Sequence, residues 1–242
     1  MEKYTERTYR KRVIARHLVS FHVAIKETDL WLSADRNLEK ETRDLTFNYR
    51  NQLESYIRSH PEFLTTLQPY PEDPYAPPMV REMIKMTGEI GVGPMASVAG
   101  AIAQFVANDL LRLTDQVIVE NGGDIFLKAN RPVTVAIFAG ESPLSEKIGV
   151  MIPTKQMPVG ICSSSGTVGH SLSTGKADVV CLLSPSAVLA DGAATALGNR
   201  IRRKNDLERI AAWVNQVEGV FGGLVIMGDK MATWGDIELV SL

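Results

Sequence analysis

The stretch from residue 116 to residue 183 contains six short apolar runs separated by glycine, proline and polar residues. They read QVIVEN, DIFLKA, VTVAIFAG, KIGVMIP, VGICSS and ADVVCLL. Runs of this length between turn residues are typical of β-strands. Helical patterns lie before and after the strands and do not alternate with them, as they would in a parallel βαβ sheet. The tract therefore predicts an α+β fold, with mixed or antiparallel sheets and packed helices.

The segments around this tract have hairpin and helix patterns. Residues 18–34 alternate apolar and polar side chains on either side of the turn KETD, which predicts a hairpin. Apolar residues recur at helical spacing from about 37 to 59, and Pro61 ends that helix. Further helices are expected at about 79–87, 94–113, 186–201 and 205–217, and strands again from residue 222.

We expect a single domain over residues 1–242 with three parts. A hairpin-plus-helix region covers residues 1–66, and a stiff connector with five prolines covers residues 67–78. The remaining residues, 79–242, form a core that carries all the motifs described below. The sequence does not indicate an oligomeric state.

Composition and charge narrow the class of protein. The chain has 45% hydrophobic and 22% charged residues, as ordinary globular proteins do, and its net charge of −2 argues against nucleic-acid binding. It has neither a long apolar run nor a signal-like start, so we expect a cytoplasmic protein without a membrane span. A basic cluster, Arg7 to His17, is either a solvated face or an anion contact. Cys162 and Cys181 lack metal-ligand spacing.

The segment GVGPMASVAG, residues 91–100, matches part of a dinucleotide-binding fingerprint. That fingerprint requires a buried strand before it and βαβ units after it, and neither pattern is present. We therefore interpret the segment as a glycine-rich start of a helix. Its free N–H groups could face an anion.

Two further motifs have both a structural and a functional interpretation. NGGD places Gly122 and Gly123 between two strand runs, which is typical of a hairpin turn, while Asp124 could face a cleft. In LADGAATAL, Asp191 and Thr195 are four residues apart and so share one helix face. Their oxygens suit Mg²⁺, but small residues around them are also typical of tight helix packing.

The stretch GICSSSGTVGHS, residues 160–171, combines three adjacent serines with a histidine. It does not fit the G-x-S-x-G pattern of a nucleophile elbow, so a hydrolase triad has no support here. His170 is then either a base or a hydrogen-bonding spacer. The serines and Gly166 are more consistent with the wall of a ligand cleft.

In their order and spacing, these motifs resemble the ApbE family of flavin transferases, which cleave FAD and attach FMN to a threonine or serine of a protein. The resemblance covers residues 90–200 and is closest to an uncharacterised branch of ApbE-like proteins. It implies FAD or FMN as the ligand, Mg²⁺ as the metal and a protein as the acceptor.

The resemblance also implies roles for individual residues. Asp191 and Thr195 resemble the family's side-chain Mg²⁺ ligands. The carbonyl near Ala96 resembles the family's backbone ligand to Mg²⁺. His170 resembles the histidine of the family's SHI segment, which we take as the catalytic base. The residues that resemble the flavin nucleotide site are Gly93, Pro94, Gly122, Gly123, Asp124, Ser164, Ser165 and Gly166.

Two positions differ from the family pattern. Ala99 stands where a charged residue, often lysine, is typical, and Gly93 stands where many members have aspartate. Two alternatives to a transferase therefore stay open. The chain could bind a flavin or nucleotide without catalysis, or use the same fold for another small molecule.

Overall fold

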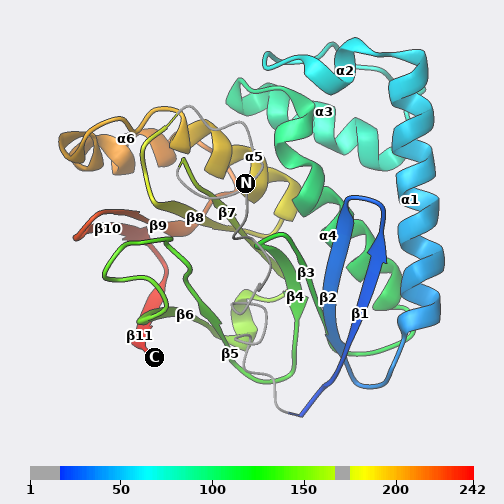
Figure 1. The fold of residues 1–242 in the computed structure, drawn as a ribbon, viewed down its shortest axis with the longest axis horizontal. Helices are drawn as coiled ribbons and strands as arrows, with labels where there is room; N and C mark the ends of the chain where they lie inside the picture. The colour runs from blue at the N-terminus through cyan, green and yellow to red at the C-terminus, as the bar shows by residue number, and fades with distance from the viewer. Residues whose placement is uncertain (1–16, 167–174) are drawn as a thin grey trace.

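The structure is a computed structural model that describes residues 17–166 and 175–242. Its main sheet has eight strands in the order β1-β2-β3-β4-β7-β8-β9-β10, and every neighbouring pair is antiparallel. These strands are β1 (Val19–Ile25), β2 (Thr28–Ala34), β3 (Val117–Asn121), β4 (Asp124–Lys128), β7 (Val159–Ser164), β8 (Val179–Ser184), β9 (Gly222–Met227) and β10 (Lys230–Gly235). The predicted α+β class is confirmed (Figure 1).

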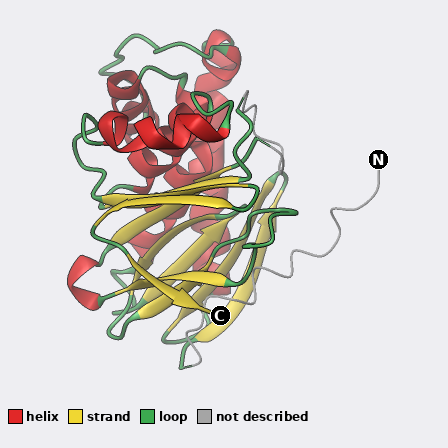
Figure 2. Cartoon of the chain, turned by 90° about the vertical axis from the view of Figure 1, so that its left-hand side faces the viewer, coloured by secondary structure: helices red, strands yellow, loops and turns green. Residues whose placement is uncertain are grey.

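A second sheet of three strands covers one face of the main sheet (Figure 2). Its order is β11 (Glu238–Ser241), β6 (Ile148–Ile152) and β5 (Val133–Ala136). Alternate residues of the main sheet face it: Ile118 and Leu127 pack in one core cluster with Val150. The sheet packing therefore follows from the two-residue period of the strands.

The helices pack on the opposite face of the main sheet (Figure 2). Val119 and Phe126 of the sheet share a core cluster with residues of α1, α3 and α4. The helices are α1 (Glu39–Ser59), α2 (Glu62–Thr65), α3 (Pro78–Ile90), α4 (Val98–Leu110), α5 (Ala187–Gly198) and α6 (Ile210–Val214). Short 3₁₀ helices are η2 (Pro94–Ser97), η3 (Thr154–Gln156) and η4 (Lys204–Arg209).

The helix boundaries differ from the sequence prediction in three places. The helix expected over 94–113 begins as η2 and continues as α4, because Pro94 starts a tight turn. The helix expected over 205–217 is η4 followed by the short α6. Helix α2 was not predicted and follows Pro61 directly, because proline fits the first turn of a helix.

Helix α5 lies directly on the main sheet. All twelve of its residues are buried, in keeping with their apolar and small side chains. A Cβ on Gly160 of β7 would lie 2.4 Å from the Cα atom of Ala187, so strand and helix backbones are in contact. This close approach fixes the distance between α5 and the main sheet.

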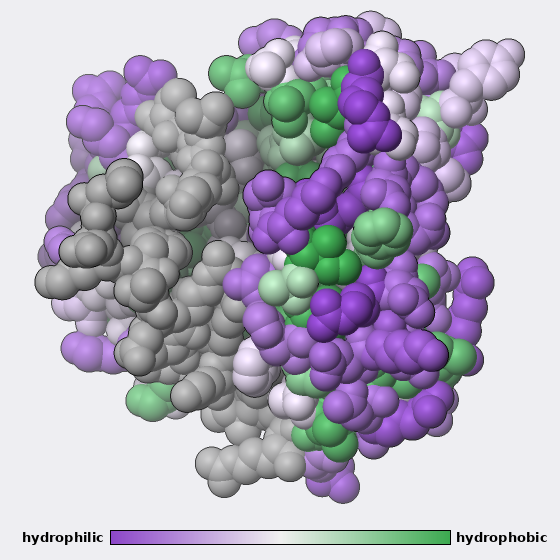
Figure 3. Space-filling model, turned by 45° about the vertical axis from the view of Figure 1, so that its right-hand side comes forward, coloured by the Kyte–Doolittle hydropathy of each residue, from purple (hydrophilic) through white to green (hydrophobic). Residues whose placement is uncertain are grey.

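No single helix in the described ranges is long and apolar enough to span a bilayer. Only α3 taken together with residues 94–110 meets those criteria, and the pair is bent by 105°. The side of the molecule that carries α1 is mostly hydrophilic, with small and separate apolar areas (Figure 3). Exposed apolar side chains of the described residues include Phe47 on α1 and Tyr75 in the connector.

Candidate functional site

The NGGD motif forms the turn between β3 and β4. Gly122 and Gly123 both have positive φ, +66° and +108°, which glycine adopts without strain. The carboxylate of Glu120 accepts a hydrogen bond of 2.7 Å from the N–H of Gly123. The hairpin interpretation of this motif is therefore correct, and Asp124 is the first residue of β4.

Asp124 is buried and connects this turn to β7. Its Oδ1 accepts a hydrogen bond of 3.0 Å from the N–H of Ser163, and the thiol of Cys162 lies against the same carboxylate. Burial raises the pKa of Asp124 to about 7, and the nearby charge of Glu120 adds to the shift. A negative charge at this position is therefore poorly stabilised by the protein itself.

Asp191 is the second buried carboxylate of this region. From α5 it reaches the first turn of α4, where Oδ2 accepts a hydrogen bond of 2.9 Å from the N–H of Gly100. Burial raises the pKa of Asp191 well above its ordinary value, and the charge of Asp124 raises it further. The two carboxylates are thus close enough to interact electrostatically.

The predicted metal ligands come from α5 and η2, which pack against each other. A Cβ on Gly192, next to Asp191, would lie 2.9 Å from Ile90 and 3.8 Å from Cβ of Ser97 at the end of η2. Thr195 follows Asp191 by one helical turn and is also buried. Among the described residues, no group of three or more His, Cys, Asp and Glu side chains could hold a metal ion, so hydroxyl and carbonyl ligands would be needed.

Gly93 and Pro94 begin η2. Pro94 occupies its first turn, and the N–H of Ala96 donates to the carbonyl oxygen of Gly93 at 3.1 Å. A Cβ on Gly93 would lie 2.0 Å from the carbonyl oxygen of Thr66. The lack of a side chain at Gly93 therefore lets the start of the proline-rich connector pack directly on η2.

The serine turn follows β7. Ser164 is only 5% exposed, and its Oγ has no hydrogen-bond partner in the described part of the chain. Ser165 and Gly166 come next, and the N–H of Gly166 donates to the carbonyl oxygen of Ala177 at 3.0 Å. An unpaired buried hydroxyl is costly, which makes Ser164 a candidate for contact with a ligand.

Close glycine contacts place the serine turn at the C-terminal end of α5. A Cβ on Gly166 would lie 2.1 Å from the carbonyl oxygen of Gly175, and one on Gly175 would lie 1.9 Å from that of Gly198. His170 and the basic residues Arg7, Arg10, Lys11, Arg12 and Arg16 lie outside the described residues.

The sequence analysis did not predict site contacts for three buried residues. Glu120 binds the glycine turn, Cys162 lies against Asp124, and Gln104 binds the start of α5. A signal existed for two of them: Glu120 is the charged residue of the run VIVE, and Gln104 is the polar residue of the run AIAQFVA. A polar residue in a buried run requires a partner, although the sequence does not show which one.

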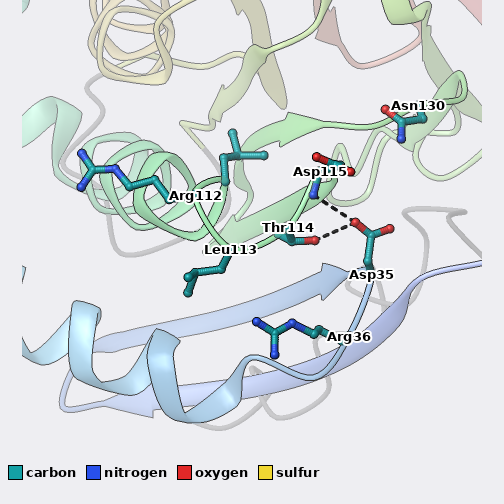
Figure 4. Close-up of a pocket in the computed structure, with 8 residues that line it drawn as sticks. Asp35, Arg36, Arg112, Leu113, Thr114, Asp115 and Asn130 are labelled. Carbon is teal, nitrogen blue, oxygen red and sulfur yellow. Dashed lines mark hydrogen bonds between the residues drawn. The ribbon is translucent and has the colours of Figure 1, made fainter.

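A pocket of about 540 Å³ lies at the opposite end of α4 (Figure 4). Its lining residues are Asp35, Arg36, Leu111, Arg112, Leu113, Thr114, Asp115 and Asn130. None of the predicted site residues lines it. The Asp35 carboxylate is already bound by the side chains of Thr114 and Gln116, each at 2.7 Å. We therefore do not assign this pocket to the candidate site.

Comparison with solved structures defines the class of protein. The fold matches that of flavinyl transferase ApbE from Pseudomonas stutzeri, with a TM-score of 0.61 and 15% identity over 90% of this chain and 94% of that chain. It also matches flavin transferase ApbE from Vibrio cholerae, with a TM-score of 0.58 and 13% identity over 90% and 96% of the two chains. The protein thus has the ApbE fold.

Sequence comparison then gives the family. The chain belongs to the family described as AbpE bacteria, whose model matches residues 10–227. It is 41% identical to a UPF0280 protein of Methanocella arvoryzae over 217 residues, 89% of this chain and 88% of the relative. A UPF0280 protein of Methanothrix thermoacetophila is 43% identical over 191 residues, 78% of this chain and 79% of the relative. The ApbE-like resemblance inferred from the motifs is confirmed.

Proposed function

We propose that this protein transfers FMN from FAD to a hydroxyl group of an acceptor protein in a Mg²⁺-dependent reaction. The fold and family support the flavin-transferase class. The observation that carries the proposal is the pair of buried carboxylates, Asp124 and Asp191, in the same region as the hydroxyl of Ser164, which has no partner among the described residues. Buried carboxylates of this kind are stabilised by a cation.

The residues around Asp191 fit a magnesium ion. The carboxylate of Asp191, the hydroxyl of Thr195 and the carbonyl oxygen of Ala96 are hard oxygen ligands, and α5 packs directly on the helix that contains Ala96. Bound there, Mg²⁺ would neutralise charge on the pyrophosphate and on the leaving phosphate. Asp124, which binds β7 through the N–H of Ser163, would then hold the glycine turn beside the ion.

In this proposal the chain positions the flavin nucleotide through the turns of β3–β4 and β7. Gly93 and Pro94, which are buried at the start of η2, would line the site, and the turn Gly122–Gly123 offers the exposed backbone of Gly122. Ser164 and Ser165 would supply hydroxyl donors to phosphate or to the flavin, and Gly166, whose N–H donates to Ala177, would hold the turn. Each of these donors would stabilise charge that develops during transfer.

The chemical step is a phosphoryl-type substitution. The oxygen of the acceptor hydroxyl forms a bond to the FMN phosphorus, and the bond from that phosphorus to the AMP oxygen breaks. AMP leaves, and the proton of the acceptor hydroxyl passes to a base, which we propose to be His170. No oxidant or reductant is needed.

Mass spectrometry after incubation with FAD, Mg²⁺ and a hydroxyl-bearing acceptor peptide tests the proposal. We expect AMP release together with a flavinylated peptide, and the loss of both in EDTA or in Asp191→Asn. Gln156→Glu on η3, away from the predicted site residues, is a control that should keep both products. Tight FAD binding with neither product would contradict the transferase proposal.

A non-catalytic flavin-binding or nucleotide-binding protein is the second candidate. It is favoured by Ala99, which has no charged side chain and whose carbonyl oxygen accepts a hydrogen bond of 3.1 Å from Asn121. This candidate predicts that FAD raises the melting temperature without turnover. If FAD neither raises the melting temperature nor is turned over, the fold serves another small molecule. A thermal-shift screen of nucleotides and divalent metals would identify it.

A further inference from the structure

Helices α4 and α5 cap each other's N-termini. Asp191 of α5 accepts a hydrogen bond of 2.9 Å from the N–H of Gly100 in the first turn of α4. In return, Oε1 of Gln104 on α4 accepts hydrogen bonds of 2.6 Å and 3.4 Å from the N–H groups of Ala187 and Val188, the first two residues of α5. These N–H groups have no partner within their own helix. Each helix therefore supplies a side-chain acceptor for N–H groups in the first turn of the other helix.

The amide of Gln104 is oriented by α3. Its Nε2 donates to the Glu82 carboxylate at 2.8 Å, so its Oε1 is directed to the start of α5. Ser186, the N-cap residue of α5, lies within 3.4 Å of both the Glu82 carboxylate and Oε1 of Gln104. With Gln104 itself only 7% exposed, this network excludes water from the first turn of α5.

The crossing of α4 and α5 leaves little space for movement. A Cβ on Gly100 would lie 2.4 Å from the carbonyl oxygen of Ala187 and 2.9 Å from Cβ of Asp191. The backbones touch at this point, so the crossing of α5 and α4 is held by this contact together with the hydrogen bonds of Gln104. Asp191 and Thr195 lie one and two turns from that anchored end, so their positions depend on it.

We propose that Gln104 is a positioning residue, oriented by Glu82, that holds α5 so that Asp191 and Thr195 can bind a divalent cation. This inference rests on the proposed function, because the cation is the one proposed above. Gln104 does not contact the cation in this proposal and acts through the first turn of α5.

Variants that exchange the amide of Gln104 and the carboxylate of Glu82 distinguish the positioning role from a role in packing alone. Gln104→Glu can still accept from Ala187, but it places a second carboxylate 2.8 Å from that of Glu82. The double variant Gln104→Glu with Glu82→Gln restores one amide donor and one carboxylate acceptor. The wild type, the single variants Gln104→Glu and Glu82→Gln, and the double variant have nearly the same side-chain volume, so packing is almost unchanged.

The affinity for Mn²⁺, measured by electron paramagnetic resonance or calorimetry on the full chain, is the direct readout. We expect Gln104→Glu to weaken Mn²⁺ binding about tenfold, which corresponds to about 1.4 kcal/mol, and the double variant to bind within about twofold of the wild type. Gln156→Glu is the matched control: it also introduces a carboxylate beside another, that of Asp236, and should leave Mn²⁺ binding unchanged.

The outcomes separate this inference from the transferase proposal. Folded Gln104→Glu with wild-type affinity, a double variant without recovery, or a wild type that does not bind Mn²⁺ would each overturn the positioning role. A wild type that binds Mn²⁺ but releases no AMP would overturn only the transferase proposal, because the metal affinities of the variants would still test Gln104. If Gln104→Glu does not fold, Gln104→Met, which has a similar volume and no acceptor for the N–H of Ala187, takes its place: it should also weaken Mn²⁺ binding, and wild-type affinity in it would overturn the inference.

Discussion

Gly100 and Ala187 are in direct backbone contact, and this contact joins the two helices on which the candidate site depends. We expect Gly100→Ala to lower the free energy of unfolding by about 1–3 kcal/mol, because its Cβ would lie 2.4 Å from the carbonyl oxygen of Ala187. Urea denaturation measures this change. Gly88→Ala on α3 is the matched control, since its Cβ would meet no atom within 4 Å. It should raise stability by about 0.5–1 kcal/mol, and equal effects of the two variants would contradict this packing.

Asp191 has two separable roles, a helix cap and a proposed metal ligand. Asp191→Asn keeps an oxygen that can accept from Gly100, whereas Asp191→Ala loses the cap. In EDTA we therefore expect the Asn variant to be more stable than the Ala variant by about 1 kcal/mol. Mg²⁺ should raise the melting temperature of the wild type and of neither variant. An Asn variant that keeps the full Mg²⁺ response would argue against Asp191 as a ligand.

Ser164→Ala should affect ligand binding and stability in opposite directions. The hydroxyl of Ser164 is buried without a partner in the described part of the chain, so its removal should leave stability unchanged or raise it. The affinity for FAD should fall about two- to tenfold, as expected for one lost hydrogen bond. Both quantities are measured on one sample, by thermal unfolding and by flavin fluorescence titration.

The control for Ser164 is another buried serine whose hydroxyl has a partner. Ser142 donates a hydrogen bond of 2.7 Å to the carbonyl oxygen of Gly228. Ser142→Ala should lower the free energy of unfolding by about 1 kcal/mol and leave FAD affinity unchanged. A Ser164→Ala variant that loses stability like Ser142→Ala would show that its hydroxyl has a structural partner.

The carboxylate of Asp35 should make the free energy of unfolding depend on pH in the acid range. The Thr114 hydroxyl and the N–H of Asp115 (Figure 4) donate to its carboxylate, as does the Gln116 side chain, and these bonds lower the pKa of Asp35 below the ordinary value of 3.8. A lowered pKa in the folded state contributes stability above the ordinary pKa, and that contribution is lost as pH falls through the lowered value. The stability difference between wild type and Asp35→Asn should therefore be present at pH 7, modest in size because Asp35 is exposed, and shrink below about pH 4.

Urea denaturation across this pH range measures the difference. Asp44→Asn on the exposed surface of α1 is the control and should have a much smaller effect at pH 7. If the difference between wild type and Asp35→Asn did not change with pH, the hydrogen bonds to Asp35 would not favour its charged form.

Features that depend on neighbouring residues could be predicted from the sequence. The hairpin at Gly122–Gly123 follows from two glycines between strand runs, and the shared face of Asp191 and Thr195 follows from helical spacing. The α+β class follows from the uninterrupted series of strand runs. In each case, backbone sterics and side-chain period act within a few residues, so the local sequence is sufficient.

Features that depend on distant residues were decided by tertiary structure. The pairing of β11 with β6, the use of Asp191 as the cap of α4, and the binding of Gln104 to the start of α5 join residues that are about 80 or more positions apart. Sequence alone showed that Gln104 and Glu120 are polar residues in apolar runs. Which donors they bind depends on where helices and strands cross, because a buried polar group takes the nearest partner that the packed chain offers.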